Sequence, residues 1–163
     1  MKIFGVTGWK NAGKTGLMER LVAEITARGF TVSTVKHAHH SFDVDQPGRD
    51  SYRHRAAGAQ EVVLASPKRV AVMTELRGAS EPALADLLSR LAPCDLVLIE
   101  GYKREPHPKI ECWRREAGHE LIQPGDPSIL AVAADCALDV SVPVLDLDDT
   151  AAIADFVLAQ VGL

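Results

Sequence analysis

The feature that most constrains the fold of this chain is a glycine-rich loop close to its N-terminus. The loop reads Gly8-Trp9-Lys10-Asn11-Ala12-Gly13-Lys14-Thr15, which matches the pattern G-x-x-x-x-G-K-[ST]. An apolar segment at residues 2–7 precedes it and predicts a buried strand, and apolar spacing predicts a helix over about residues 14–28. Strand, loop and helix follow one another in the order of a P-loop, which binds the phosphates of a nucleoside triphosphate.

The residue types in this loop serve phosphate binding. Glycines let the loop curl so that backbone N–H groups converge on phosphate oxygens, and the following helix N-terminus adds a partial positive charge. The Lys14 ammonium is expected to reach the β- and γ-phosphates, and the Thr15 hydroxyl to bind Mg²⁺. The positions expected to contact the nucleotide are Gly8, Asn11, Ala12, Gly13, Lys14, Thr15 and Gly16.

Strands and helices alternate along the rest of the chain. Strands are expected at residues 30–36, 95–100, 110–113, 129–134 and 142–147, and helices at residues 49–57, 81–91 (capped by Ser80) and 149–161. Residues 61–65 and 69–74 have the spacing of a β-hairpin. The pattern predicts an α/β protein with a three-layer P-loop NTPase fold, whose sheet is mainly parallel with an antiparallel hairpin portion. Because 163 residues fit one domain, residues 1–163 are expected to form a single P-loop nucleotide-binding domain.

Charge is unevenly distributed along the chain. Residues 1–115 hold all 18 Lys and Arg against 13 Asp and Glu, a net charge of +5, whereas residues 116–163 hold nine acidic residues and no Lys or Arg. A basic region beside a phosphate loop favours anionic ligands, although an acidic segment that merely solvates the surface explains the asymmetry equally well. Nucleic acid is not an expected partner, because the net charge is −4 and no aromatic–basic stacking pattern occurs.

Hydropathy and cysteine usage bear on location. No apolar run reaches the roughly 18 residues that span a bilayer, so no membrane association is expected. Cys94, Cys112 and Cys136 are scattered and form no pair motif, and an odd number leaves at least one unpaired. This usage fits a reducing, cytoplasmic location better than a disulfide framework.

A P-loop site also needs a carboxylate at the end of a neighbouring strand to hold hydrated Mg²⁺. The apolar strand at residues 95–100 begins with Asp95 and ends with Glu100, which lies about 17 Å further along at ~3.3 Å per residue. Ligands bind at the carboxyl ends of parallel strands, which selects Glu100. Asp95 is expected at the opposite edge, as a strand-start or turn residue.

A polar segment follows the second predicted strand, near the same edge. Its histidines, His37, His39 and His40, are good zinc ligands, but no cysteine or further histidine pair at the usual spacing supports a zinc site. The better interpretation is a substrate or switch loop, in which Asp43 or Asp45 contacts hydrated Mg²⁺ or the attacking water. A solvated polar loop is the alternative. The candidate catalytic residues are thus Lys14, Asp45 and Glu100, and the candidate Mg²⁺ ligands are Thr15, Glu100 and Asp43.

Four motifs together give a specific resemblance. They are the P-loop, the run Lys36-His37…His40-x-Phe42-Asp43-x-Asp45, the run Pro47-Gly48-x-Asp50-Ser51…Arg53 with Ala57-Gly58-Ala59, and Ile99-Glu100-Gly101-Tyr102-Lys103. Over nearly the whole chain, the sequence resembles the MobB family of molybdopterin-guanine dinucleotide biosynthesis adapter proteins. The departures are Ala12 and Gly16, where relatives often have a small hydroxyl residue.

The resemblance implies a function and partners. It implies binding of GTP with Mg²⁺ and assistance to a MobA-type molybdopterin guanylyltransferase, which joins GMP to molybdenum-bound molybdopterin. It also implies homodimers, contact with molybdopterin, and at most weak Mg²⁺-dependent GTPase activity.

The guanine base is assigned mainly through the resemblance, since the common Asn-Lys-x-Asp motif is absent from the sequence. Ala133-Ala134-Asp135, at the end of a predicted strand, resembles the family's short equivalent. The Asp135 carboxylate is expected to accept hydrogen bonds from guanine N1 and its 2-amino group, which adenine cannot offer. Its alternative role is that of a local loop cap.

Other functions remain open at the level of sequence. The sequence shows no obvious arginine finger or water-positioning glutamine, which agrees with slow hydrolysis. A small-molecule P-loop kinase is the main alternative, with the arginine-rich residues 49–55 as a lid over the phosphates. The third hypothesis is an interaction module whose P-loop is vestigial and binds no nucleotide.

Overall fold

The computed structural model of the chain describes residues 1–38 and 42–163. Backbone contacts divide it into two compact units, one formed by Met1–His37 with Arg90–Leu163 and the other by Ala38–Ser89. The P-loop and Glu100 both belong to the first unit, whereas Asp43 and Asp45 belong to the second. That residues 1–163 form one nucleotide-binding domain stays a prediction.

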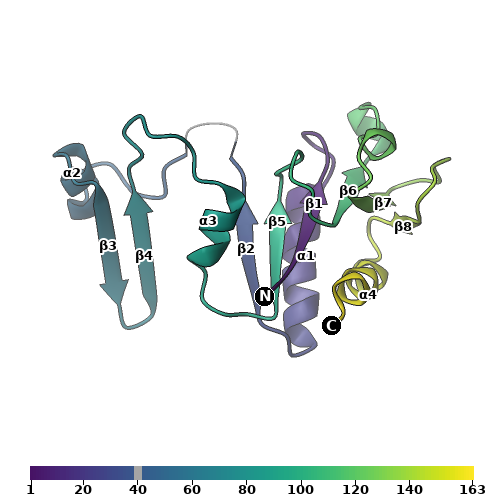
Figure 1. Cartoon of the computed structure of the whole chain (residues 1–163), viewed down its shortest axis with the longest axis horizontal. Helices are drawn as coiled ribbons and strands as arrows, with labels where there is room; N and C mark the ends of the chain where they lie inside the picture. Colours follow the sequence, from purple (N-terminus) through teal and green to yellow (C-terminus); the bar gives the residue numbers. More distant parts are fainter. Residues whose placement is uncertain (39–41) are drawn as a thin grey trace. The chain divides into compact units, whose positions relative to one another are not determined.

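The first unit is built on a six-stranded parallel sheet (Figure 1). Its strands, in spatial order, are β2 (Val32–Lys36), β5 (Leu96–Glu100), β1 (Lys2–Thr7), β6 (Lys109–Trp113), β7 (Ile129–Ala134) and β8 (Val144–Asp146). All five residues of β5 are buried, as expected for an interior strand of a parallel sheet. The α/β fold with a mainly parallel sheet is confirmed.

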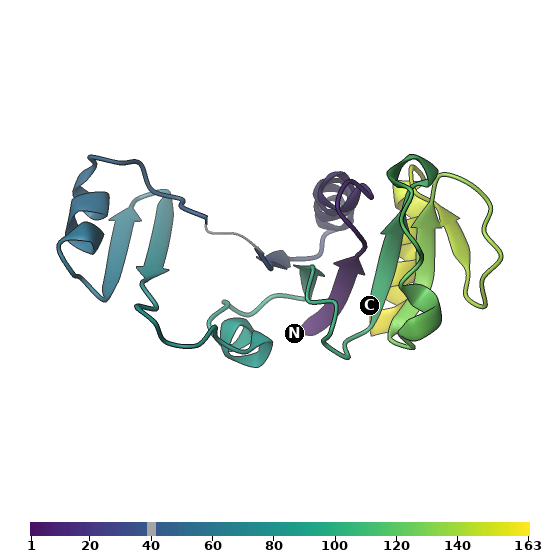
Figure 2. The same ribbon diagram turned by 90° about the horizontal axis from the view of Figure 1, so that it is seen from above.

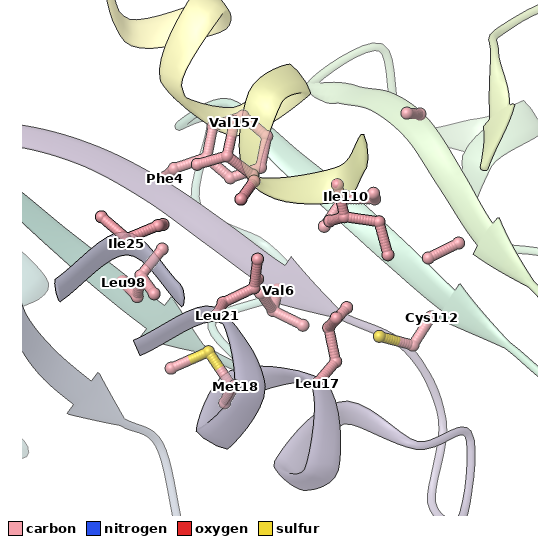
Figure 3. Close-up of a cluster of buried hydrophobic side chains, with 14 of the residues drawn as sticks. Phe4, Val6, Leu17, Met18, Leu21, Ile25, Leu98, Ile110, Cys112 and Val157 are labelled. Carbon is pink, nitrogen blue, oxygen red and sulfur yellow. The ribbon is translucent and has the colours of Figure 1, made fainter. Parts of the chain in front are cut away.

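Two helices and one face of the sheet form the apolar core. Helix α1 (Lys14–Ala27) contributes Leu17 and Leu21, and helix α4 (Thr150–Val161) contributes Val157 (Figure 3). These side chains pack with Phe4 of β1, and all four are completely buried. Because side chains alternate along a strand, Phe4 and Val6 face this core while Gly5 and Thr7 point to the opposite face.

Loops rather than α-helices of the first unit lie against that opposite face, beside β6. The short 3-10 turns η1 (Arg115–Ala117) and η2 (Gln123–Gly125) belong to these loops (Figure 2). The buried Glu111 carboxylate accepts hydrogen bonds from the backbone N–H groups of Ile122 and Gln123. Burial raises the pKa of Glu111, against the effect of these donors, and lowers the pKa of the neighbouring His107 to about 4.

Lys109 is a fully buried cation on the same face. Its ammonium donates to the backbone carbonyls of Lys103 and Glu105, to the Asp126 carboxylate and to the Ser128 hydroxyl. A buried ammonium is tolerated only when its donors are satisfied in this way. Lys109 therefore joins the segment that follows β5 to the segment that precedes β7.

The second unit contains the antiparallel hairpin. Strands β3 (Glu61–Ser66) and β4 (Arg69–Thr74) pair so that Val63 lies opposite Val72, which confirms the predicted hairpin. Helices α2 (Asp50–Ala56) and α3 (Leu84–Ser89) complete this unit. Val63, Val70 and Val72 are all more than half exposed, on one face of the hairpin.

Several element boundaries differ from the sequence prediction; strand β8 (Val144–Asp146), for example, is shorter at both ends than the strand expected at residues 142–147. Strand β2 begins at Val32 rather than at residue 30, because the Thr31 N–H bonds the Asp95 carboxylate instead of a strand partner. Helix α3 begins at Leu84, so Ser80 is not its cap. Pro82 disfavours helical backbone at Glu81, which excludes Ser80 as the cap. In the part of the chain that the structure describes, every helix is too short or too polar to cross a bilayer.

The buried lysine generates the first prediction. Lys109→Met removes the charge and leaves Asp126 and two carbonyls without their donor, so the free energy of unfolding should fall by about 3–5 kcal/mol. Urea-induced unfolding measures the loss. Lys2→Met, at an exposed position on β1, is the matched control and should change stability little. Equal stability of the two variants would contradict the structural role of Lys109.

Candidate functional site

The glycine-rich loop connects β1 to α1 and has backbone geometry that side chains resist. Gly8 has φ of 136° and Gly13 has φ of 97°, both in the region that favours glycine. A Cβ atom on Gly8 would lie 2.5 Å from the carbonyl oxygen of Cys112, so β6 packs directly against the loop. Asn11, with φ of 65°, is a residue type that tolerates this conformation. The loop therefore curls as a P-loop requires.

Helix α1 begins directly at Lys14. Its cap, Gly13, has no side chain with which to satisfy the N–H groups of the first turn, and that turn contains no acidic residue. These N–H groups and the helix dipole thus favour an anion at this end. Gly16 is exposed in the same turn, and a Cβ there would meet only Arg20, at 3.6 Å.

The Lys14 side chain lies back over the loop. Its ammonium donates a hydrogen bond of 2.6 Å to the backbone carbonyl of Trp9. Partial burial lowers the pKa of Lys14, while the nearby Glu100 carboxylate acts in the opposite direction. An ammonium that is partly desolvated and bound to one neutral acceptor is available to a phosphate.

Glu100 lies beside the loop, at the carboxyl end of β5. The Thr15 hydroxyl donates to Glu100 Oε1 at 3.2 Å, and the Lys36 ammonium is 3.1 Å from the same oxygen. Asp95 lies at the other end of the strand, where it accepts hydrogen bonds from Thr31, so the predicted separation of the two carboxylates is confirmed. A hydroxyl next to a carboxylate is a donor set that fits Mg²⁺, which prefers oxygen ligands.

The Trp9 side chain is partly exposed but has three side-chain contacts outside the P-loop. Its indole N–H donates to the Glu120 carbonyl at 2.9 Å, and its ring lies 5.8 Å from the His119 ring, centroid to centroid. The Lys103 ammonium sits 3.7 Å from the centroid of the indole ring. These contacts bind two connecting segments to the P-loop.

Arg114 is a site residue that sequence reasoning missed. Its Nε would lie 3.1 Å from a Cβ atom on Gly13, so the guanidinium is next to the cap of α1. The Leu147 side chain contacts the same position from the residue after β8, at 3.2 Å. Arg114 directly follows β6, and the rule that ligands bind at the carboxyl ends of strands would have singled it out.

A cavity of about 350 Å³ lies at the carboxyl ends of β7 and β8. Asp135 lines it, and Asp135 Oδ1 accepts a hydrogen bond of 3.1 Å from the backbone N–H of Arg115. Asp146 lines it too, a second carboxylate that sequence reasoning did not select. Leu147, the residue after Asp146, lies against Gly13 of the P-loop.

The aspartates of the polar segment form their own cluster in the second unit. The Arg55 guanidinium donates to both oxygens of Asp43, at 2.8 and 2.9 Å, and to Glu75 at 2.7 Å. The Arg55 hydrogen bonds lower the pKa of Asp43. Asp45 accepts from the Ser51 hydroxyl at 2.9 Å. The Mg²⁺ role of Asp43 and the catalytic role of Asp45 stay predictions.

The histidines are only partly described. His39 and His40 lie outside the described residues. The His37 ring stacks on the Tyr102 ring at 4.6 Å between centroids. Among residues 1–38 and 42–163, no three His, Cys, Asp or Glu side chains gather in a way that could hold a metal ion.

Comparisons with known proteins identify the family of this chain. The family model described as "Molybdopterin guanine dinucleotide synthesis protein B" matches residues 3–135. The chain is 41% identical over 161 residues to the molybdopterin-guanine dinucleotide biosynthesis adapter protein of Escherichia coli (strain K12), covering 96% of this chain and 91% of that protein. It is 42% identical to the protein of the same name from Haemophilus influenzae, covering 95% and 86%.

The similarity extends to solved structures. The crystal structure of a MobB protein homolog from Bacillus stearothermophilus superposes with a TM-score of 0.74 at 29% identity, covering 99% of both chains. Family match, relatives and fold agree over most of the sequence. The chain therefore belongs to the molybdopterin guanine dinucleotide synthesis protein B family, MobB.

Proposed function

We propose that this chain is a GTP-binding adapter protein of molybdopterin guanine dinucleotide biosynthesis that assists the partner guanylyltransferase. The observation that carries the proposal is the convergence of Thr15 with Glu100, at 3.2 Å, beside a P-loop whose lysine lies over the loop. Relatives that cover more than 90% of the chain are named as adapter proteins of this biosynthesis. The site explains how such an adapter would bind its nucleotide.

The triphosphate and Mg²⁺ have defined partners in this proposal. Backbone N–H groups of the loop and of the first turn of α1 would bind the phosphates, together with Lys14. Thr15 would contact Mg²⁺ and Glu100 would hold it, at the point where the two side chains meet. Bound Mg²⁺ supplies charge neutralisation on the β- and γ-phosphates. The Lys36 ammonium, 3.1 Å from Glu100 Oε1, forms an ion pair with the same carboxylate.

The cavity at the ends of β7 and β8 is the proposed site of guanine. Asp135 and Asp146 both line it. An ionised carboxylate accepts hydrogen bonds and donates none, so it pairs with a base that offers donors. Guanine offers two donors on one edge, N1–H and the 2-amino group, whereas adenine offers no equivalent pair. Leu147, which lies against Gly13 of the P-loop, directly follows Asp146 of the cavity lining, and in this proposal one nucleotide reaches from the loop to this cavity.

Hydrolysis by this site should be slow. Phosphoryl transfer depends on positioning and on charge stabilisation, and Lys14 and Arg114 are two cations that lie at the start of α1. Asp45, the residue expected to contact the attacking water, already accepts hydrogen bonds from the Ser51 hydroxyl and the Gln46 N–H. A hydrogen bond from the attacking water to the Asp45 carboxylate would compete with these two bonds. Weak GTPase activity, contact with molybdopterin and a homodimer remain parts of the proposal that rest on the family.

Titration with GTP and ATP tests the proposal directly. Isothermal titration calorimetry with Mg²⁺ should show GTP binding in preference to ATP. Lys14→Ala should abolish triphosphate binding without loss of the fold, because it removes the cation that meets the β- and γ-phosphates. Lys2→Ala, at the amino end of β1, is the control and should bind normally. Tight ATP binding without GTP preference would instead favour a small-molecule kinase.

The role of Glu100 predicts a change in metal dependence. Glu100→Gln keeps the shape of the side chain but loses its charge, so the gain in GTP affinity on adding Mg²⁺ should shrink by about ten-fold or more. Asp95→Asn, at the other end of the same strand, should leave this gain unchanged. An undiminished Mg²⁺ effect in Glu100→Gln would refute the assignment.

Base recognition predicts a loss of selectivity. Asp135→Ala should weaken GTP binding by about ten-fold while changing ATP binding little, because only guanine loses hydrogen bonds to the carboxylate. Asp139→Ala removes an exposed carboxylate four residues further along and serves as the control. If Asp135→Ala keeps the full preference for GTP, the base is not read by this residue.

A further inference from the structure

Two lysine ammonium groups from separate segments meet on one residue of the P-loop. The Lys14 ammonium donates to the backbone carbonyl of Trp9 at 2.6 Å, and the Lys103 ammonium lies 3.7 Å from the centroid of the Trp9 ring. Lys14 belongs to α1, whereas Lys103 comes from the connection between β5 and β6, three residues after Glu100. Lys103 is thus a second cation at the loop. It lies on the segment that begins just after Glu100, the proposed Mg²⁺ ligand.

Trp9 is itself held in place by residues outside the P-loop. Its indole N–H is bound to the Glu120 carbonyl, and its ring rests near the His119 ring. A cation over the face of tryptophan is attracted by the ring quadrupole, most strongly where water is partly excluded. The ring therefore forms a fixed platform that limits where the Lys103 ammonium can lie.

The electrostatics of the pair favour an anion close by. Burial lowers the pKa of Lys103, and the positive charge of Lys14 lowers it further, while Glu111 acts in the opposite direction. Burial also lowers the pKa of Lys14. Two like charges in a partly desolvated place are unfavourable, and an anion between them removes that repulsion.

The position of Lys14 identifies which part of a nucleotide would lie there. In a P-loop this lysine reaches the β- and γ-phosphates, and here its ammonium rests on the Trp9 carbonyl. The terminal end of a bound triphosphate is therefore expected beside Trp9, next to Lys103. We propose that Lys103 binds the γ-phosphate of the nucleotide and that the Trp9 ring positions its ammonium for this contact. This inference rests on the proposed function and extends it.

The consequence is discrimination between nucleotides by the number of their phosphates. A cation that meets only the γ-phosphate strengthens GTP binding and leaves GDP binding almost unchanged. Lys14 and the loop N–H groups also meet the α- or β-phosphates, which both nucleotides share, so their contribution is not confined to the triphosphate. Lys103 would therefore tell the triphosphate state from the diphosphate state of the adapter.

Calorimetric titration of GTP and GDP, with Mg²⁺, tests the inference in four proteins. These are the unmodified protein, Lys103→Met, Lys103→Arg and the control Arg104→Met, which removes an exposed cation one residue further along. Lys103→Met should weaken GTP binding by about ten-fold or more and GDP binding by less than about three-fold. Lys103→Arg keeps the charge over the ring and should retain most of the GTP preference, and Arg104→Met should behave as the unmodified protein does.

The outcomes separate this inference from the function on which it rests. If the unmodified protein binds neither nucleotide, the proposed function and the inference both fail. If it binds GTP, and Lys103→Met binds GTP equally well or loses GTP and GDP affinity to the same extent, the inference alone fails. The thermal unfolding midpoint of Lys103→Met, unchanged from that of the unmodified protein, shows that the fold is intact.

A double-mutant cycle tests the positioning role of Trp9. Trp9→Leu removes the platform, so it should reduce the ratio of GTP to GDP affinity, though less than Lys103→Met does. Because Trp9 acts through Lys103, the double variant should show the ratio of Lys103→Met alone. Fully additive losses would show that the indole does not act through this lysine.

Discussion

The hydrogen bond between the Thr15 hydroxyl and the Glu100 carboxylate depends on the parallel pairing of β1 with β5. Their register places Glu100 beside Val6, two residues before the first glycine of the P-loop. A shift of one residue would turn Glu100 to the other face of the sheet. All five residues of β5 are buried. They fix the register, because β5 cannot shift along β1 without disrupting the packing of the core. Apolar packing thus sets the geometry of a polar site.

The rest of the site follows from the same sheet edge. β6 and β8 end next to the loop and bring Arg114 and Leu147 against Gly13, and the cavity lined by Asp135 opens at the ends of β7 and β8. The connection after β5 brings Lys103 to Trp9. Each of these groups comes from a residue at or just beyond the carboxyl end of a parallel strand, where an α/β sheet binds its ligands.

Much of this arrangement is predictable from the sequence, and the remainder has physical causes. The P-loop and Glu100 are identified by local patterns, since strand, glycine turn and terminal carboxylate are all short-range signals. Arg114 and Asp146 are not, because their importance depends on which strands are neighbours, and strand order is a long-range property. The contact of Lys103 with Trp9 is equally non-local. The bounds of β2 and α3 shift because a side-chain hydrogen bond to Asp95 and a proline override simple periodicity.

The central claim is that the loop at Gly8–Thr15 holds the phosphates of GTP while Thr15 and Glu100 hold its Mg²⁺. A crystal structure of the protein with Mg²⁺ and a non-hydrolysable GTP analogue tests it most directly. The account predicts phosphates on the loop N–H groups and Lys14, Mg²⁺ between Thr15 and Glu100, and guanine next to Asp135. An analogue bound away from the loop, or a loop without phosphate at saturating analogue, would contradict it.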